Sequence, residues 1–585
     1  MLTLLIDSQP VTLPEDFALE IHRENPLFFR SGDYTYDIEL SLLDPDNRRL
    51  YDHIDRIQHT TSISHRSAVL IEGDTVLLNG TEAILEKTGD TVKIQILAGN
   101  AELNYLTGDE TRIRSLNFGT VPTPTTAIAE DVAYKIFPES NYVFPTILKK
   151  YDFENADDTH NELINKLSST LTSRDIAYDS DSELYPMPYF MYILEKFVRL
   201  MGYTLTSNPY RDTSKWARLL IIHGYETLEY AKMLPDWTTA KFVQEVEKFL
   251  NCIILIDPLT KGCQIIPIPD YYSNNPVTYI PDDAILDDFD IAFDADEDHF
   301  FISYENLSYN LPSGAYWKYA RLSAEVKELC GNPVYGNTSL ITPSEDNANK
   351  FIIYYDSAPS HDLYFVCFDR GEDGGVYRYI FQEVDQFRDL IRNPSLEPVS
   401  FDIIPSEIHT IRVTDYTSSY AYALIPYPVF YENTESLGFQ DAVTNGIKDS
   451  ASNIMQVAFY GGVLPCYSRQ GEIGTTHRSP QCFCNNASIN DTLGVFQIRG
   501  TDIPGANSMN LRFQSQYGRA AQDFTSPYSI DTTHKRTIRF ISDKYIDPVS
   551  IFQIQNKRYA CRELKYTFKN GQRSNIVEGI FYPIS

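Results

Sequence analysis

The chain has few cysteines, few tryptophans and no long apolar run. Eight Cys in 585 residues are too sparse for a disulfide scaffold, and several stand in strand-like runs where a free thiol is a small apolar filler. No apolar run reaches the roughly 18–20 residues that span a bilayer. The opening residues, MLTLLIDSQP, lack a basic leader and predict a first strand instead of a signal peptide. We therefore expect a protein made in a cytoplasm, without structural disulfides.

Positive charge is also scarce. Lys and Arg number 49 against 80 Asp and Glu, giving a formal net charge of -31, and no basic run is present. This balance disfavours a general nucleic-acid binder, because affinity for phosphate depends mainly on positive charge.

Enzyme signatures are absent as well. The chain has no H-E-x-x-H, G-x-S-x-G or G-x-G-x-x-G motif, and no phosphate loop ending in G-K-[ST]. With so many acidic residues, inspection neither identifies nor eliminates a glycosidase pair. The sequence favours a protein that is not an enzyme and that needs no cofactor.

Tyrosine and phenylalanine are abundant, at 41 and 32 residues. Aromatic residues favour half-buried β surfaces and subunit contacts. A chain of this length is too long for one core. We predict a mainly β fold with α+β units: two tube-like β domains at the N- and C-terminal ends, with helix-strand units between them.

Turn signals and composition give the expected domain boundaries. Residues 1–118 alternate like antiparallel strands, with turns predicted at Asn79-Gly80 and Gly89-Asp90. Near the C-terminal end, Asn570-Gly571 predicts the turn of a further hairpin. Two prolines in GTVPTPTT open a linker predicted at 119–135. The remaining divisions are an α+β region at 136–275, an acidic β connector at 276–330, a β-rich middle region of unknown role at 331–500, and a C-terminal β domain at 501–585.

Two stretches in the α+β region predict the same helix-strand unit. Offset by 49 positions, their apolar residues follow the i, i+1, i+4, i+7, i+8 spacing of one helical face. Each helix is predicted to end at a residue that tolerates the left-handed conformation, and an apolar strand follows. The defining residues of these structural units are Ile193, Leu194, Phe197, Met201 and Gly202, and Phe242, Val243, Val246, Leu250 and Asn251.

Two clusters resemble metal sites weakly. Asp294, Asp296, Asp298 and Glu305 occupy positions 1, 3, 5 and 12 of a calcium-loop template, but His299 stands where the sharp turn requires glycine. A solvated acidic loop is the preferred interpretation. Cys466, His477, Cys482 and Cys484 could supply four zinc ligands, but they lack the usual C-x2-C halves. We therefore assign no metal.

Several segments resemble the tail-hub or baseplate proteins of phages that infect Bacteroidetes. They are LEIHRENPLFFRSGDYTYDIELSL, VKIQILAGNAELNYL, YPMPYFMYILEKFVRLMGYTL, LPDWTTAKFVQEVEKFLNCIILID and the ending IFQIQNKRYACRELKYTFKNGQRSNIVEGIFYPI. Together they touch the first 270 residues and the last 45. The region from about 300 to 500 carries no such resemblance.

This resemblance implies a structural virion protein at the distal tip of the tail. Such a hub forms a homotrimer around the DNA exit path, where three chains with two tube-like β domains each match a sixfold tail tube. Its expected partners are other copies of itself, the tail tube or a distal tail protein, and further baseplate or receptor-binding proteins. The acidic composition is compatible with a channel that lets the genome slide during ejection.

Two other classes of function stay open from sequence. One is a receptor- or glycan-binding tail module that uses residues 300–500 for recognition. The other is a tail-associated cell-wall hydrolase. New reducing ends or free amines after incubation with peptidoglycan or capsule would favour the hydrolase.

Overall fold

The computed structural model describes most of residues 2–292 and 519–585, together with shorter stretches between them. Within the first range, the residues not described are 15–16, 30–31, 55, 57–64, 109–110, 151–161, 169–175, 213–214, 274–275 and 287–289. Strands make up 45% and helices 18% of the structure, which confirms the mainly β class with α+β units. No helix in the described part of the chain is long and apolar enough to cross a bilayer.

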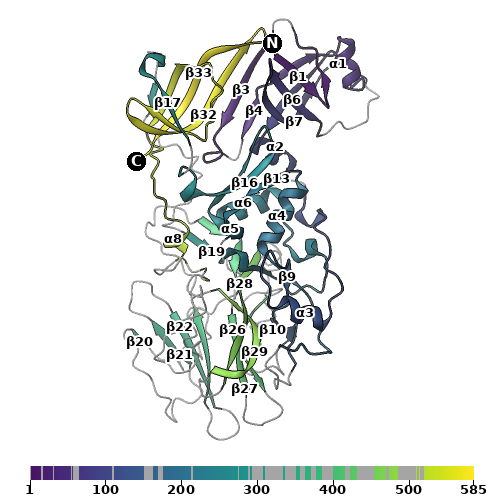
Figure 1. Cartoon of the computed structure of the whole chain (residues 1–585), viewed down its shortest axis with the longest axis vertical. Coiled ribbons are helices and arrows are strands. Elements are labelled where there is room, and N and C mark those ends of the chain that lie inside the picture. The colour runs from purple at the N-terminus through teal and green to yellow at the C-terminus, as the bar shows by residue number, and fades with distance from the viewer. Residues whose placement is uncertain are drawn as a thin grey trace.

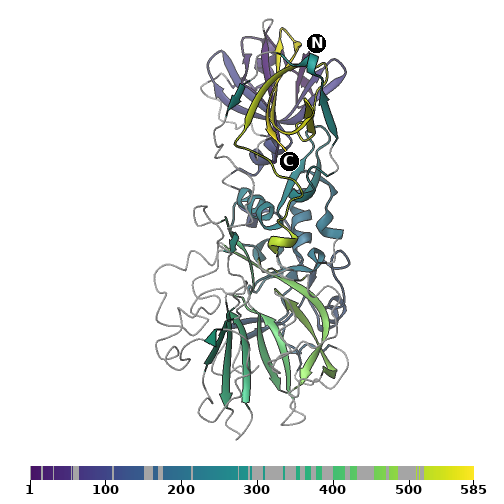
Figure 2. The ribbon, with the colours of Figure 1, turned by 90° about the vertical axis from the view of Figure 1, so that its left-hand side faces the viewer.

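Three regions follow one another along the long axis of the molecule (Figures 1 and 2). The upper region contains the strands within 2–98, 277–292 and 535–583. The middle region contains most of the helices and short strands within 100–270, and those within 126–150 extend down beside the lower region (Figure 1). The lower region contains the strands within 334–483, at the end of the molecule opposite the N-terminus.

Both ends of the chain contribute to the upper region as one 14-stranded sheet. The N-terminal strands are β1 (Leu2–Ile6), β2 (Gln9–Pro10), β3 (Ala18–Glu24), β4 (Asp33–Thr35), β5 (Ile38–Ser41), β6 (Ser67–Glu72), β7 (Thr75–Lys87) and β8 (Thr91–Ala98), with helix α1 (Pro45–Leu50) beside them. The later strands are β17 (Val277–Ile280), β18 (Asp290–Ala292), β30 (Lys535–Ile541), β31 (Ile551–Ile554), β32 (Lys557–Lys569) and β33 (Gln572–Pro583).

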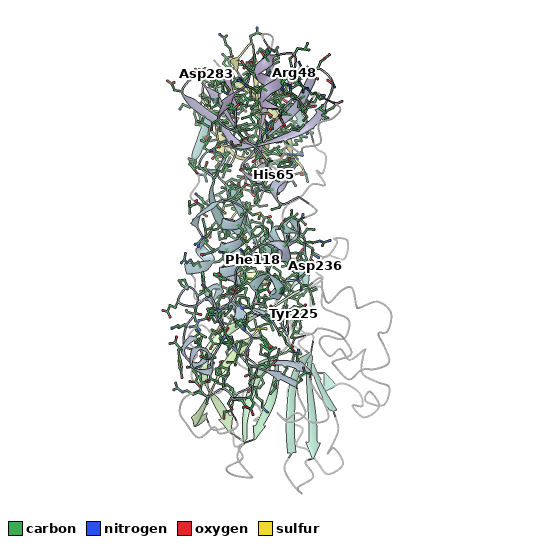
Figure 3. All side chains as sticks on the ribbon, turned by 90° about the vertical axis from the view of Figure 1, so that its right-hand side faces the viewer. Arg48, His65, Phe118, Tyr225, Asp236 and Asp283 are labelled. Atoms are coloured by element: carbon green, nitrogen blue, oxygen red, sulfur yellow. The ribbon has the colours of Figure 1, made fainter. Side chains whose placement is uncertain are left out.

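Strand β3 joins the two sets, because it pairs antiparallel with β32 from Ala18–Lys569 to Glu24–Glu563. Figure 3 accordingly shows Arg48, in α1 beside the first set, and Asp283, between β17 and β18 of the second set, at the same end of the molecule. The N- and C-terminal β structures are therefore one body, linked across more than 500 residues of sequence.

Two predicted turns are confirmed and one is wrong. Gly89-Asp90 separates β7 from β8, and Asn570-Gly571 separates β32 from β33 with φ angles of 52° and 70°. Asn79-Gly80 lies inside β7. Glycine is required at position 80 because a Cβ there would stand 1.9 Å from the carbonyl oxygen of Leu97 on β8. The pair marks a close strand approach, which in sequence is indistinguishable from a turn signal.

The middle region contains both predicted helix-strand units. The helices of this region are α2 (Asn100–Leu106), α3 (Thr126–Val132), α4 (Phe190–Leu200), α5 (Pro209–Asp212) and α6 (Thr239–Leu250). Helix α4 leads to β13 (Thr204–Ser207), and α6 leads to β15 (Cys252–Ile256). Strand β16 (Gly262–Pro267) pairs parallel with β13 and antiparallel with β15, so the two units flank one central strand.

The two helices pack antiparallel through their apolar faces. Phe190 at the start of α4 contacts Phe249 near the end of α6, with ring centroids 6.1 Å apart. Near the opposite ends, Phe197 and Phe242 meet edge to face at 4.9 Å. The apolar residues that define the two units are buried, except Met201, which is partly buried. The doubled unit is thus a paired layer between the two β regions.

Both helices end in the left-handed conformation at the predicted residues, Gly202 (φ 89°) and Asn251 (φ 50°). After α4, the N–H of Gly202 donates to the carbonyl of Arg199, and the N–H of Tyr203 donates to that of Val198. These two bonds form a Schellman motif. The side chain of Asn251 also donates to the carbonyl of Asp523, at 2.9 Å.

Replacing Gly202 with alanine is expected to lower the free energy of unfolding by about 1 kcal/mol. A Cβ at this position meets no atom within 4 Å, so the whole cost comes from the left-handed backbone. Chemical denaturation measures the difference. Gly89→Ala is the matched control, because its Cβ also enters open space but its φ is not positive. Equal effects of the two substitutions would contradict the assignment.

Most of the described strands of the lower region lie in two sheets. The first contains β14 (Leu219–Ile222), β25 (Ile403–Pro405), β26 (Ile408–Thr414), β27 (Tyr422–Pro428), β28 (Met455–Ser468) and β29 (Ile473–Phe483), and the second contains β20 (Val334–Tyr335), β21 (Phe351–Tyr355), β22 (Leu363–Arg370) and β23 (Tyr377–Val384). Strand β14, from the middle of the chain's α+β part, pairs with β28 and ties the first sheet to the helices.

One apolar core runs from the middle region into the lower region. Residues 119–135, expected as a linker, take part in it: Val121 and Ala129 are buried, and the N–H of Val121 donates to the carbonyl of Leu228 at 2.8 Å. Short pairs complete the described fold, namely β9 (Tyr142–Val143) with β12 (Met187–Pro188), β10 (Ile147–Lys150) with β11 (Glu162–Ile164), and β19 (Leu307–Tyr309) with β24 (Val399–Phe401).

Candidate functional site

The two weak candidate metal clusters are only partly within the described residues. Asp294, Asp296, Asp298 and Glu305 lie outside them, as do the side chains of Cys466 and His477. Cys482 and Cys484 are buried free cysteines, and burial raises the pKa of both thiols. Among the residues that the structure describes, no three His, Cys, Asp or Glu side chains gather in a metal-binding group.

A buried histidine, His223, is held by backbone groups on both sides of its ring. Its Nε2 lies 2.8 Å from the carbonyl oxygen of Pro186, and its Nδ1 accepts from the N–H of Tyr225 at 3.2 Å. This arrangement fits a neutral ring with the proton on Nε2. Burial lowers the pKa of His223 to about 4, from an ordinary value of 6.5. The histidine therefore supports the fold in its neutral form.

Acidification is expected to destabilise the protein through this side chain. Between pH 6.5 and 4 the unfolded histidine takes up a proton that the folded one does not, so stability falls as the pH falls. From pH 7 to pH 5 this contribution is about 2 kcal/mol. The measurement is the free energy of unfolding of wild type and His223→Gln at both pH values. Equal pH dependence in the two proteins would contradict the buried neutral state.

The β15–β16 hairpin is held by two asparagines, one in β7 of the upper sheet and one in α2, the helix that directly follows β8. Asn100, at the start of α2, donates to the carbonyl of Ile254 at 2.6 Å and accepts from the N–H of Ile256 at 3.0 Å. Its amide therefore bonds the outer edge of β15 as a neighbouring strand would. Asn79 of β7 donates from its side chain to the carbonyl of Leu259, in the hairpin turn, at 2.8 Å.

Glu102 links the same elements from within α2. Its side chain is 1% exposed and accepts from the hydroxyl of Thr81 on β7 at 2.6 Å. It also pairs with Lys261 at 2.9 Å and accepts from the hydroxyl of Tyr203 at 3.3 Å. One buried carboxylate thus bonds the upper sheet and both helix-strand units.

Asn25 links three parts of the chain: strand β32, the loop at Pro548, and Tyr271, which follows the β15–β16 hairpin. It is fully buried and donates to the carbonyl of Cys561 on β32 at 2.8 Å, and it accepts from the hydroxyl of Tyr271 at 2.7 Å. A further donor bond reaches the carbonyl of Pro548 at 3.2 Å. Because buried amides without partners are costly, these bonds fix the relative position of the upper and middle regions.

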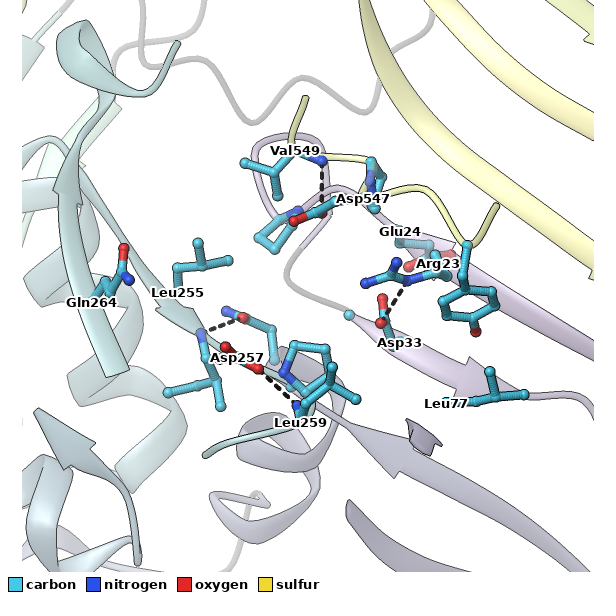
Figure 4. A pocket seen from close by; sticks show the side chains of 18 of the residues that line it. Arg23, Glu24, Asp33, Leu77, Leu255, Asp257, Leu259, Gln264, Asp547 and Val549 are labelled. Atoms are coloured by element: carbon cyan, nitrogen blue, oxygen red, sulfur yellow. Dashed lines mark hydrogen bonds and ion pairs between the residues drawn. The ribbon is translucent and has the colours of Figure 1, made fainter. Parts of the chain in front are cut away.

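A cleft of about 530 Å³ lies beside these hydrogen bonds, where the upper region meets the β15–β16 hairpin (Figure 4). Its walls come from β3 and β4, from the β15–β16 hairpin and from residues 545–549. Arg23 pairs with Asp33 at 2.8 Å, donates to the carbonyl of Ile546, and lies 4.8 Å from the ring centre of Tyr545. Burial raises the pKa of Asp33, and the neighbouring Arg23 opposes this effect.

We define the junction as Asn25, Asn79, Asn100 and Glu102 with the backbone groups they bond. Its geometry fits a rigid joint between two bodies, because each side chain bonds elements remote in sequence. Sequence reasoning named only Asn79, as part of a turn, and identified none of the four residues as a contact between regions. A single asparagine or glutamate carries no short-range signal when its partner is more than 150 residues away.

Comparisons with known proteins give no family. No protein-family model matches the chain, and no curated protein matches it. Among solved structures, the chain is similar to the 43 kDa tail protein of prophage MuSo2 from Shewanella oneidensis, with a TM-score of 0.30, 8% identity, and coverage of 99% of this chain and 95% of that one. It is also similar to a tail protein from Neisseria meningitidis MC58, with a TM-score of 0.31, 6% identity, and coverage of 100% and 96%. At such scores the likeness by itself assigns neither a fold nor a role.

Proposed function

We propose that the chain is a non-catalytic structural protein of a phage tail. In this proposal it forms a homotrimeric hub at the distal tip of the tail. The upper region contacts the tail tube or a distal tail protein, and the lower region contacts tip or receptor-binding proteins. The ring surrounds the path by which DNA leaves.

The observation that carries this proposal is the rigid junction between the upper β region and the middle region. A protein that transmits force or position along an assembly needs bodies whose relative placement is fixed. The junction supplies this, since Asn25, Asn100 and Glu102 are buried and bonded across it. Together with the sequence resemblance to hub proteins, this favours a connecting role over a hinged, substrate-closing one.

Exposed apolar residues on strands at the edges of the upper sheet add support for assembly. Val277 and Tyr279 of β17 are 50% and 60% exposed, and Ile291 of β18 is 39% exposed. Within the described residues, β17 pairs only with β31 and β18 only with β30. Edge strands with exposed apolar side chains pair readily with other chains, which suits a ring of subunits.

Labelling of intact particles tests the proposed location. Gold-labelled antibodies against the purified chain are expected to bind one end of the phage tail, at the tip, in electron micrographs. Labelling spread along the tail, or confined to the head, would contradict the proposal.

A second candidate is a receptor- or glycan-binding tail module. The observation that favours it is the position of the lower region, which stands at the far end of the long axis from the upper region (Figure 1). This role is compatible with a hub whose lower end reaches the cell surface. Binding of the purified chain to host surface glycans, abolished by competing soluble glycan, would support it.

A further inference from the structure

The cleft beside the junction has features of a binding site that are not needed to hold the upper and middle regions together. Its three walls are remote in sequence, and its volume of about 530 Å³ lies within the range usual for ligand sites. In Figure 4, the Arg23 side chain reaches from β3 toward the centre of the cleft, while Asp257 and Leu255 stand on the opposite wall.

Two hydrogen-bond donors at the cleft lack acceptors among the described residues. Arg23 is 9% exposed and uses its Nε and Nη1 groups on Asp33 and Ile546, while its Nη2 group has no such bond. Tyr545 also lines the cleft, and its hydroxyl is buried and has no hydrogen-bond partner among the described residues. A buried donor without a partner, here the Tyr545 hydroxyl, is rare and calls for an explanation, such as a ligand that supplies an acceptor.

The charge of the lining selects the kind of ligand. Arg23 is accompanied by four carboxylates, Glu24, Asp33, Asp257 and Asp547, which gives a formal charge of -3. Asp257 and Asp547 are exposed at the rim, and each holds a backbone N–H in its own turn. A free anion is disfavoured in such a field, whereas neutral carbonyl oxygens and cationic groups are favoured.

We propose that this cleft binds an extended, basic peptide segment of a neighbouring protein. Backbone carbonyls of the segment accept from Arg23 Nη2 and the Tyr545 hydroxyl, and lysine or arginine side chains pair with Asp257 and Asp547. Extended segments bind through their main chain in this way, and rim charges add specificity. The site does not depend on the proposed tail role.

Calorimetric titration of the full chain with two blocked pentapeptides tests this proposal. The peptide GKGKG is expected to bind with one-to-one stoichiometry and more weakly as salt rises, and GEGEG is expected not to bind. The double variant Asp257→Asn/Asp547→Asn keeps both turn acceptors and removes two charges. It is expected to bind GKGKG at least about fivefold more weakly.

Two further variants make the test specific. Asp179→Asn is the matched control, because Asp179 also accepts a backbone N–H two residues on and lies outside the cleft. It is expected to bind like wild type. Tyr545→Phe removes a hydroxyl without a partner, so its thermal stability should be unchanged or higher while peptide binding weakens. No binding of GKGKG to wild type at millimolar concentration, or equal binding by the double variant, overturns the proposal.

Discussion

Replacing Arg519 with methionine is expected to lower the free energy of unfolding by about 3–5 kcal/mol, the largest single effect that the structure predicts. Arg519 is fully buried at the start of α8 (Arg519–Gln522). Its Nε donates to Asp523 at 2.9 Å, its Nη1 to the hydroxyl of Tyr309 at 3.1 Å, and its Nη2 to the carbonyl of Phe249. In the methionine variant, the Asp523 carboxylate and the carbonyl of Phe249 in α6 lose the hydrogen bonds that Arg519 donates.

A double-mutant cycle separates this account from simple loss of packing. Asp523 also pairs with Lys215, at 3.2 Å, so the carboxylate keeps one cation in Arg519→Met, whereas Asp523→Asn removes the carboxylate from both cations. If the ion pair dominates, the double variant is more stable than the sum of the single effects predicts, by about 1 kcal/mol or more. Additive effects, measured by urea denaturation, would show that the two side chains act independently.

Replacing Asn100 with alanine is expected to release the β15–β16 hairpin from α2, the helix that directly follows β8 of the upper sheet. The substitution leaves the buried carbonyl of Ile254 and the N–H of Ile256 without their partners, at a cost of about 2–4 kcal/mol. Because the lost hydrogen bonds hold only the β15–β16 hairpin, we expect this hairpin to open locally before the whole protein unfolds.

Hydrogen exchange at the amide of Ile256 measures this directly. In the variant the amide is expected to exchange about 30-fold faster or more, because its bond to Asn100 is lost. Asn104→Ala is the control: Asn104 lies one turn later on α2 and is exposed, so Ile256 should exchange as in wild type. Unchanged exchange in Asn100→Ala would mean that the hairpin is held by other contacts.

Local features of the fold could be predicted from sequence because their causes are local. The apolar faces of α4 and α6, the left-handed residues Gly202 and Asn251, and the hairpin at Asn570-Gly571 each depend on a few neighbouring residues. The error at Asn79-Gly80 has the same origin. In sequence, a glycine that forms a turn cannot be told from a glycine that allows a neighbouring strand to approach closely. Gly80 is of the second kind, and its neighbour, Leu97 on β8, is known only from the structure.

The long-range features could not be predicted, because they join segments with no shared pattern. The pairing of β3 with β32 unites residues near 20 and near 565, and alternation in each strand fits many partners equally well. The same holds for the junction, where Asn100 replaces a strand partner for β15. The cleft follows from the meeting of three such segments, so no spacing in the sequence indicated it.

The central claim, a ring-forming structural protein, is tested most directly by electron microscopy of the purified chain. The account predicts particles with threefold symmetry, in which the upper regions of three subunits surround a central opening. A sixfold ring would indicate a distal tail-ring protein in place of a hub. A chain that remains monomeric at the concentrations at which tails assemble would contradict the claim.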